Sequence, residues 1–327
     1  MTLKTRDFLT LHDFTRQELE QIIEISEILK KERSTGGYSQ LLKGKLLLQL
    51  YQKASTRTRA SFKGAMWELG GDADYWKVEE TQAGRGETWF DTGKILSGYG
   101  YSSVMARLYK HSDLEELAKG SDIPVINGLT DKFHPCQTLG DVLTIKEVKG
   151  RIEGLKVAFV GDCYFNMANT TLIGCTMLGM NVVLVCPNKE KYQPSREIMK
   201  IAKEKAGGKI EIMHDPKEGV KDVDIVMTDV FVSMGQESET QERINDLSPY
   251  QVNTQLMKHA KKDAIFMHCL PSNHTSENTA DKELLKKCEV TDEVFFSKKS
   301  VIWQQAYNRM HIQKGILTAI LLGGLPG

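Results

Sequence analysis

Short apolar runs of strand length alternate with segments of helical period along nearly the whole chain. In the first half the apolar runs lie at residues 45–50, 74–78, 102–108 and 124–129. Helical segments are expected between and after them, at 56–69, 87–98, 112–119 and 136–149. Alternation of this kind is typical of parallel strands joined by crossover helices, so the first half is predicted to form an open α/β sheet.

The same alternation restarts after a polar, glycine-containing stretch at 148–155, which we interpret as a hinge. Further strands are expected at 156–161, 181–187, 209–215, 224–230 and 263–271, and the last segment is typical of an amphipathic helix ended by Gly323 and Gly324. The fold class is therefore α/β, with two domains that each have a central parallel sheet flanked by helices. We place the domains at 1–150 and 151–307, with a C-terminal helix at 308–327 that packs on the first domain.

The bulk composition agrees with a two-domain cytoplasmic protein. The chain has 327 residues, and its basic and acidic side chains both total 43, so no overall charge favours a nucleic acid partner. No stretch approaches the roughly 20 apolar residues that a membrane helix needs, and no signal peptide is apparent. The six cysteines form no CxxC pair, and we expect most of them, with Cys269 as the exception, to be buried thiols, with no disulfides and no metal site.

Polar peptides follow several of the predicted strands directly. Parallel sheets bind ligands beyond the carboxyl ends of their strands, so these peptides are the candidate functional sites. They are STRTR at 55–59, Arg107, KFHPCQ at 132–137, GDCYFN at 161–166, DVFVSMG at 229–235 and HCLP at 268–271.

The pentapeptide STRTR lies where a strand ends and a helix begins. A helix N-terminus carries partial positive charge, and adding hydroxyl donors and a guanidinium fork makes a cage suited to phosphate. The alternative is an ordinary Ser or Thr N-cap with two exposed arginines. Neither a P-loop nor GxGxxG occurs, which favours a small phosphate-bearing substrate over a nucleotide.

The peptide FHPCQ places His134 and Gln137 at the start of a predicted helix. A neutral imidazole or an amide there could donate a hydrogen bond to a substrate carbonyl and stabilise the charge that develops on it. The alternative is a histidine with a structural role at the start of the helix.

Together these peptides resemble the carbamoyltransferase family, which includes aspartate and ornithine transcarbamylases. The resemblance covers the whole chain and rests on STRTR, HPxQ at 134–137, TDVFVSMGQE at 228–237, YQVN at 250–253, HCLP and the NR pair at 308–309. It implies that carbamoyl phosphate is the phosphate-bearing substrate. It also implies a homotrimer, or a multiple of trimers, and no cofactor.

The resemblance assigns a role to each matching residue. Phosphate contacts fall to Ser55, Thr56, Arg57 and Thr58, and Arg107, His134 and Gln137 would hold and polarise the carbamoyl group, with Arg309 and Leu270 nearby. Gln82 lies in a loop that resembles the family segment reaching into a neighbouring subunit.

The SMG and HCLP peptides look like those of the ornithine carbamoyltransferases. By that resemblance Asn166 and the Met234 backbone bind the amino-acid carboxylate, Asp229 and Ser233 bind its ammonium, and Cys269 with the Leu270 carbonyl orients the δ-amine. A nucleophilic role for Cys269 is disfavoured, because side chains adjacent in a strand point to opposite faces and His268 is poorly placed as its base.

Several positions depart from the ornithine pattern, so other acceptors stay open. The segment 272–289 is longer than expected and lacks an RGxE sequence, Gln305 and Tyr307 stand where acidic residues are usual, and Trp89 and Phe90 are bulky. Putrescine, an acylated ornithine or another amine are the alternatives, as are a non-catalytic family member and a dehydrogenase. The direction of flux cannot be inferred from these residues.

Overall fold

The computed structural model describes residues 3–233 and 235–326, and these divide into two units. Unit 1 contains residues up to Leu143 together with those from Tyr307 onward, and unit 2 runs from Thr144 to Ala306. The two divisions fall inside α5 (Pro135–Lys149) and α13 (Ile302–Leu322). The sequence placed the boundaries at 150/151 and 307/308.

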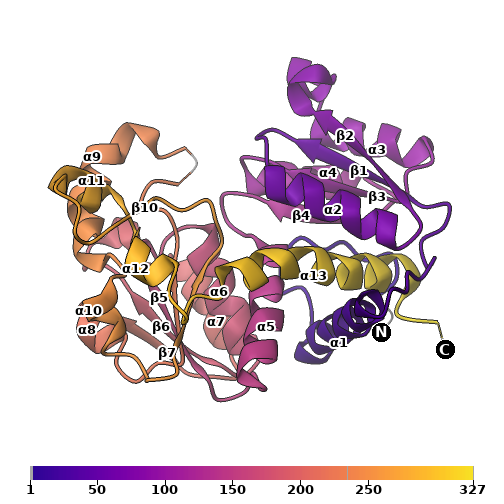
Figure 1. Ribbon diagram of the computed structural model, residues 1–327. Coiled ribbons are helices and arrows are strands. Elements are labelled where there is room, and N and C mark those ends of the chain that lie inside the picture. Colours follow the sequence, from indigo (N-terminus) through magenta and orange to yellow (C-terminus); the bar gives the residue numbers. More distant parts are fainter. Residues whose placement is uncertain (1–2, 234, 327) are drawn as a thin grey trace. The chain divides into compact units, whose positions relative to one another are not determined.

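Unit 1 is built on a four-stranded parallel sheet of order β2-β1-β3-β4. Strands β1, β3 and β4 are mostly apolar and buried, as expected of parallel strands covered on both faces, whereas the edge strand β2 has the sequence DADYWK and is largely exposed. Helix α2 lies over one face and α3 and α4 lie over the other (Figure 1). The elements are α1 (Arg16–Ser34), β1 (Leu46–Tyr51), α2 (Thr56–Glu68), β2 (Asp72–Lys77), η1 (Val78–Glu80), η2 (Ala83–Arg85), α3 (Trp89–Gly98), β3 (Ser103–Arg107), α4 (His111–Gly120) and β4 (Val125–Leu129).

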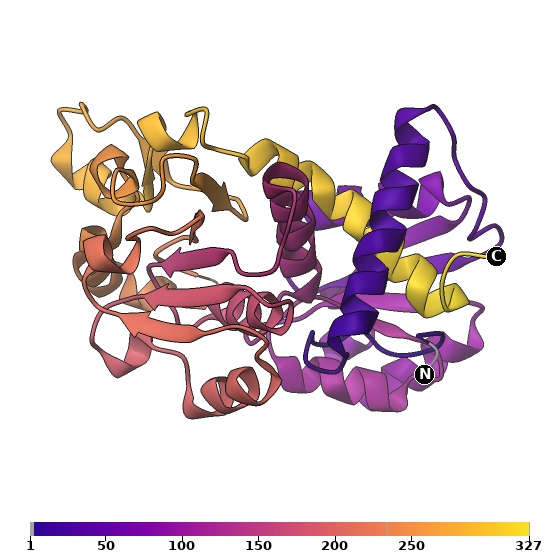
Figure 2. The same ribbon diagram turned by 90° about the horizontal axis from the view of Figure 1, so that it is seen from below.

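The C-terminal helix α13 crosses α1 at close range in unit 1 (Figure 2). A Cβ atom at Gly315 would lie 2.0 Å from the Ser26 hydroxyl oxygen, so the crossing requires a glycine. Helix α13 also passes along α2, where Met310 packs against Gly64. This packing brings the start of the unit 1 part of α13 to the helix that carries STRTR.

Unit 2 is built on a five-stranded parallel sheet of order β7-β6-β5-β8-β9. A buried cluster that includes Val160, Val226 and Phe266 packs against the helices on one face, and α6 and α7 are neighbours. The elements are β5 (Lys156–Val160), α6 (Asn166–Met177), β6 (Asn181–Val185), η3 (Glu190–Tyr192), α7 (Arg196–Lys205), β7 (Ile210–Met213), α8 (Pro216–Gly219), β8 (Ile225–Thr228), η4 (Glu237–Glu239), α9 (Thr240–Leu247), η5 (Ser248–Tyr250), α10 (Thr254–Met257), β9 (Ile265–His268), β10 (His274–Thr275), α11 (Lys282–Lys287), β11 (Val290–Thr291) and α12 (Asp292–Phe295).

The predicted α/β architecture is confirmed, with strands and helices in the predicted order. The sequence reasoning missed helix α1, although its start carries a recognisable signal: Thr15 and Glu18 form a capping box. It also missed the small β10–β11 pair, and α13 begins at Ile302, earlier than predicted.

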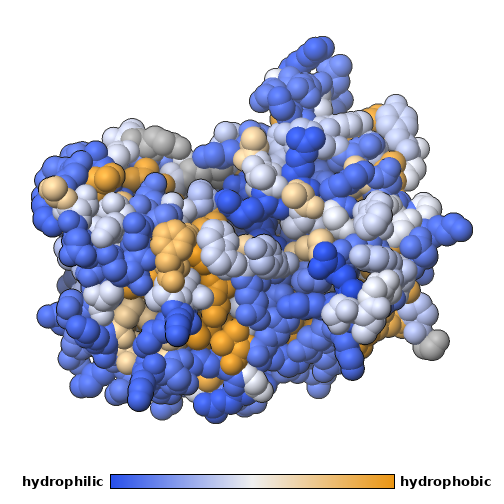
Figure 3. Space-filling view, in the orientation of Figure 1, coloured by the Kyte–Doolittle hydropathy of each residue, from blue (hydrophilic) through white to orange (hydrophobic). Residues whose placement is uncertain are grey.

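Hydrophilic residues cover most of the molecular face seen in Figure 3. Among the described residues, no helix combines the length and apolarity needed to cross a membrane.

Candidate active site

The N-terminus of α2 lies directly beyond the carboxyl end of β1 in unit 1. Ser55 is the N-cap residue, with φ −149° and ψ 115°, and its hydroxyl oxygen accepts a hydrogen bond from the Thr58 amide at 3.3 Å. No acidic residue occupies the first turn of α2, so the partial positive charge of this helix end is not neutralised from within the helix. The predicted anion site therefore has the expected local structure.

Arg309 joins this helix end from α13. Its Nη2 donates a hydrogen bond of 2.7 Å to the Thr58 hydroxyl oxygen, and both residues are almost completely buried. The two residues are 251 positions apart in the sequence. The packing of α13 along α2 thus adds a guanidinium that no local motif supplies.

His134 is buried close to three guanidinium groups of unit 1. Burial lowers the pKa of His134 well below its usual range, and the nearby positive charges of Arg309, Arg107 and Arg57 lower this pKa further. The imidazole is therefore neutral near pH 7 and can donate one hydrogen bond without adding a fourth cation. The charges of Arg57, Arg107 and Arg309, which the resemblance groups with His134, all act on this imidazole.

Gln137 lies in the first turn of α5 and is also buried. Its amide nitrogen donates a hydrogen bond of 2.8 Å to the Asp141 carboxylate, which fixes the orientation of the amide. The sequence analysis did not single out Asp141. Its position one helical turn after Gln137 is the signal that could have identified it.

The sequence analysis also missed Tyr51, which lies near the guanidinium groups of Arg107 and Arg309. It ends β1 in register with Arg107 of β3, and its hydroxyl donates a hydrogen bond of 2.9 Å to the Gln49 side chain. Burial raises the pKa of Tyr51, and the positive charges of Arg107 and Arg309 oppose that rise only in part. Tyr51 is therefore a neutral side chain that its hydrogen bond to Gln49 holds in place.

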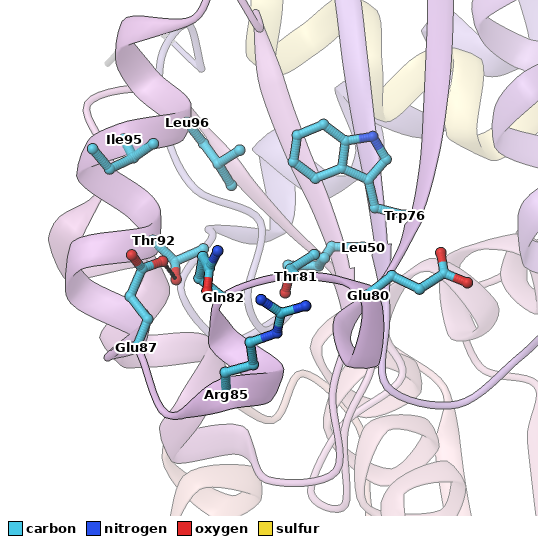
Figure 4. Close-up of a pocket in the computed structure, with 10 residues that line it drawn as sticks. All are labelled: Leu50, Trp76, Glu80, Thr81, Gln82, Arg85, Glu87, Thr92, Ile95 and Leu96. Atoms are coloured by element: carbon cyan, nitrogen blue, oxygen red, sulfur yellow. Dashed lines mark hydrogen bonds between the residues drawn. The ribbon is translucent and has the colours of Figure 1, made fainter.

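Gln82 lies in a different part of unit 1, in a pocket of about 450 Å³ shown in Figure 4. None of the STRTR residues, Arg107, His134 or Arg309 lines this pocket. Its walls are Leu50, Trp76, Glu80, Thr81, Gln82, Arg85, Glu87, Thr92, Ile95 and Leu96. Trp89 is half-buried against the apolar core under α3, and Phe90 is exposed.

The acceptor residues predicted in unit 2 follow neighbouring strands. Asn166 comes after β5, Asp229 after β8 and Cys269 after β9, and the carboxyl ends of these parallel strands lie at one sheet edge. The Cys269 thiol donates a hydrogen bond of 3.2 Å to the Asp229 carboxylate. Burial raises the pKa of Asp229, while hydrogen bonds from the Val230 amide and Cys269 oppose the rise.

Hydrogen bonds fix the tautomer of His268. Its Nδ1 accepts a hydrogen bond of 2.9 Å from the Leu270 amide, so the ring proton is on Nε2, which lies 3.1 Å from the Glu289 carboxylate. Leu270 itself has a φ of 60°, a left-handed conformation that is uncommon outside glycine. His268 and Glu289 thus hold the backbone of HCLP in a specific shape.

Asp229, His268 and Cys269 are also a candidate metal-ligand group, since one ligand atom of each lies within 4.8 Å of the others. The ring lone pair of His268, however, already accepts the Leu270 amide proton. Binding a metal ion would require that hydrogen bond to break, so the arrangement suits a hydrogen-bond network better than a cation.

Ser233 is buried, and its amide donates a hydrogen bond of 3.0 Å to the Gln236 side chain. Met234, predicted to bind the acceptor carboxylate, lies outside the described residues. The long segment after HCLP is anchored within unit 2, because Glu277 accepts hydrogen bonds from Thr254 and Thr291.

Comparisons with known proteins identify the family of the chain. The family model "Aspartate/ornithine carbamoyltransferase, carbamoyl-P binding domain" matches residues 6–147 of this chain. The family model "Aspartate/ornithine carbamoyltransferase, Asp/Orn binding domain" matches residues 153–320. The chain belongs to the aspartate/ornithine carbamoyltransferase family.

Relatives of this family resemble the chain over almost its full length. An ornithine carbamoyltransferase from Pyrococcus abyssi is 47% identical over 99% of this chain and 98% of its own, and one from Bacillus subtilis is 43% identical over 99% and 96%. The structure of the ornithine carbamoyltransferase from Pyrococcus furiosus matches with a TM-score of 0.91 at 45% identity, covering 100% of both chains. The structure of the ornithine transcarbamoylase from Giardia lamblia matches with a TM-score of 0.83 at 32% identity, covering 97% of this chain and 98% of that one.

Proposed function

We propose that this protein transfers the carbamoyl group of carbamoyl phosphate to the δ-amine of L-ornithine, giving L-citrulline and phosphate. Family membership and full-length relatives named ornithine carbamoyltransferase support this activity. The observation that carries it is the neutral His134 surrounded by Arg57, Arg107 and Arg309. Such a group suits a substrate with a phosphate dianion and a carbonyl to be polarised.

Carbamoyl phosphate binding belongs to unit 1 in this proposal. Ser55, Thr56, Arg57 and Thr58 bind the phosphate at the N-terminus of α2, where helix and side-chain donors converge. Arg107, His134, Gln137 and Arg309 hold the carbamoyl group, and the backbone of Leu270 contributes a further contact. His134 acts as a neutral hydrogen-bond donor to the carbonyl oxygen as charge develops there.

Ornithine binding belongs to unit 2. Asn166 and the Met234 backbone bind the α-carboxylate, while Asp229 and Ser233 bind the α-ammonium. Cys269 and the Leu270 carbonyl orient the δ-amine. A zwitterion needs both a donor set and an acidic acceptor, and the hydrogen-bonded Asp229–Cys269 pair supplies the acidic part.

The reaction itself balances without a cofactor. The neutral δ-amine attacks the carbonyl carbon, a C–N bond forms, the C–O bond to phosphate breaks, and the departing phosphate can accept the proton that the amine releases. The pKa of a free alkyl amine is about 10, and nearby guanidinium groups would lower it by charge repulsion. Orientation and electrostatic stabilisation then supply the rate enhancement.

We also propose that the protein is cytoplasmic and forms a homotrimer, or a multiple of trimers, in which Gln82 serves a neighbouring subunit. The pocket around Gln82 supports this role, because Arg57, Arg107, His134 and Arg309 are not among the residues that line it. A mixture of Gln82→Ala and Arg57→Ala subunits should then recover part of the activity that each variant lacks alone. No recovery in mixed oligomers would contradict the shared site.

The acceptor is tested by measuring carbamoyl phosphate-dependent phosphate release with L-ornithine, N-acetyl-L-ornithine, putrescine, L-aspartate and L-lysine. Selective turnover of L-ornithine is expected, and Arg57→Ala should abolish it without loss of the fold. Selective turnover of another amine would replace ornithine and keep the carbamoyl phosphate chemistry. Unchanged phosphate release by the Arg57→Ala variant would contradict the proposed phosphate site.

A further inference from the structure

Two loops of unit 2 that carry proposed acceptor contacts share one buried carboxylate. Asp162 follows β5 and lies in the loop that leads to Asn166, the first residue of α6. One oxygen of Asp162 accepts a hydrogen bond of 2.9 Å from the Tyr164 amide, which shapes this loop from within. The other oxygen accepts a hydrogen bond from the Arg243 guanidinium of α9.

Arg243 connects Asp162 to the second loop, which follows β8. Its Nε donates a hydrogen bond of 2.8 Å to the Phe231 carbonyl oxygen while its Nη2 binds Asp162. The guanidinium also lies over the Tyr192 ring, with its central carbon 5.2 Å from the ring centroid. Arg243 is only 2% exposed and Asp162 only 8%, so the pair is held away from solvent.

Gln236 makes a second connection between the two loops. Its side chain lies beside the Asp162 carboxylate and favours the charged form of that group, and its carbonyl oxygen accepts the Ser233 amide proton at 3.0 Å. A single side chain therefore links Ser233 to the carboxylate that shapes the approach to Asn166. Both links end on Asp162.

Stability alone does not account for such a network. A buried ion pair contributes little net stability relative to apolar residues of similar size, because removing both charges from water costs most of what their attraction returns. A fully hydrogen-bonded buried network does restrict geometry, because each group has one arrangement that satisfies it. Here the restricted quantity is the position of Ser233 relative to Asn166.

We infer that Asp162 is a positioning residue for acceptor binding, which holds the loops of Asn166 and Ser233 in the arrangement that receives an α-amino acid. This inference rests on the proposed function, since it assigns Asn166 to the carboxylate and Ser233 to the ammonium. Asp162 touches neither group of the substrate. It acts through Gln236, Arg243 and the Tyr164 amide.

The inference predicts which kinetic constant changes. Misplacing the two loops weakens binding of the α-carboxylate and α-ammonium, so the KM for ornithine rises. The carbamoyl phosphate residues of unit 1 are not part of the network, so the KM for carbamoyl phosphate stays the same. A residue that merely supported the fold would instead reduce the amount of active enzyme and leave both KM values unchanged.

The test uses Gln236→Met in the full-length protein, because methionine keeps the approximate length of glutamine and removes both the acceptor of the Ser233 amide proton and the polar group beside Asp162. Gln241→Met is the matched control, since Gln241 is an exposed glutamine in α9 whose amide contacts Asn245. Inhibition by L-norvaline isolates the α-groups, because this amino acid lacks only the δ-amine of ornithine. Asp162→Asn is a second variant that perturbs both links at once.

We expect Gln236→Met to raise the ornithine KM and the norvaline inhibition constant by the same factor, about tenfold, with the carbamoyl phosphate KM within twofold of the wild type. The Gln241→Met control should match the wild type. A norvaline inhibition constant within twofold of the wild type in an active Gln236→Met enzyme would overturn the inference alone. Absence of ornithine turnover in the wild type would overturn the proposed function, and the inference with it.

Discussion

The hydrogen bond between Arg309 and Thr58 offers a direct test of the anion site in unit 1. Thr58→Val keeps the shape of the side chain and removes the hydroxyl that accepts the Arg309 proton at 2.7 Å. Thr58 is completely buried and Arg309 is 2% exposed, so water cannot readily replace the lost partner. The proposed phosphate contact of the same hydroxyl is lost as well.

The expected magnitude follows from the charge on the donor. Hydrogen bonds to charged groups contribute about 1.5–3 kcal/mol, roughly twice the value for neutral pairs. Since about 1.4 kcal/mol corresponds to a factor of ten, the loss predicts a fall in kcat/KM for carbamoyl phosphate of roughly 10- to 140-fold. Thr58→Ser retains the hydroxyl and should lose less than about threefold.

The assay compares kcat/KM for carbamoyl phosphate in the wild type, Thr58→Val and Thr58→Ser at saturating ornithine, with circular dichroism to verify the fold. A Thr58→Val enzyme that is folded and within threefold of Thr58→Ser would refute the reasoning. In that case the hydroxyl would neither position Arg309 nor bind the phosphate.

Three further predictions concern other parts of the molecule. Asp229→Asn should raise the KM for ornithine at least tenfold and leave the KM for carbamoyl phosphate within twofold, because the amide cannot attract an ammonium; an unchanged ornithine KM would remove Asp229 from the acceptor site. The structure describes all six cysteines, and only Cys269 is not buried. A disulfide reagent should therefore modify one thiol rapidly in the native protein, with loss of activity. Rapid modification of several thiols, or full activity after modification of the first, would contradict this prediction. Burial and the charges of Lys314, Lys30 and Arg33 lower the pKa of His311 to about 4, so its contribution to folding is complete above its ordinary pKa of 6.5 and is lost as the pH falls through about 4. His311→Asn should therefore lose less stability than the wild type between pH 7 and pH 4.5, and parallel stability curves would count against it.

The fold could be predicted from the sequence because its strands are parallel and most of them are buried on both faces. Such strands appear as apolar runs that alternate with helical segments, and the alternation reaches from β1 to β9. Helix α1 was missed although Thr15 and Glu18 mark its start and its buried residues Leu19, Ile22, Ile23 and Leu29 recur at helical spacing. The capping box at Thr15 and Glu18 is therefore a sequence signal of this helix as clear as its apolar spacing.

The candidate site could be predicted only in part. Residues that lie in one peptide, such as those of STRTR, were identified together because the chemistry is local. The interaction of Asp162 with Arg243 was not identified, because the two residues are 81 positions apart and meet only in the folded protein. The lowered pKa of His134 likewise comes from its burial in the folded protein and then from the charge of Arg309, which a different helix supplies.

The departures from the ornithine pattern lose much of their weight once their contacts are known. Gln305 stands where the family usually has an acidic residue, and in unit 2 it is completely buried with its side-chain oxygen accepting the His268 amide proton at 2.9 Å. A carboxylate oxygen and an amide oxygen serve equally as that acceptor, but only the carboxylate would add a negative charge near Glu289, which already accepts from the His268 ring. Glutamine therefore keeps the hydrogen bond that holds HCLP and lowers the electrostatic cost of burying the cluster. Tyr307, the second departure, is 69% exposed and has no comparable demand to meet, so neither change by itself argues for a different acceptor.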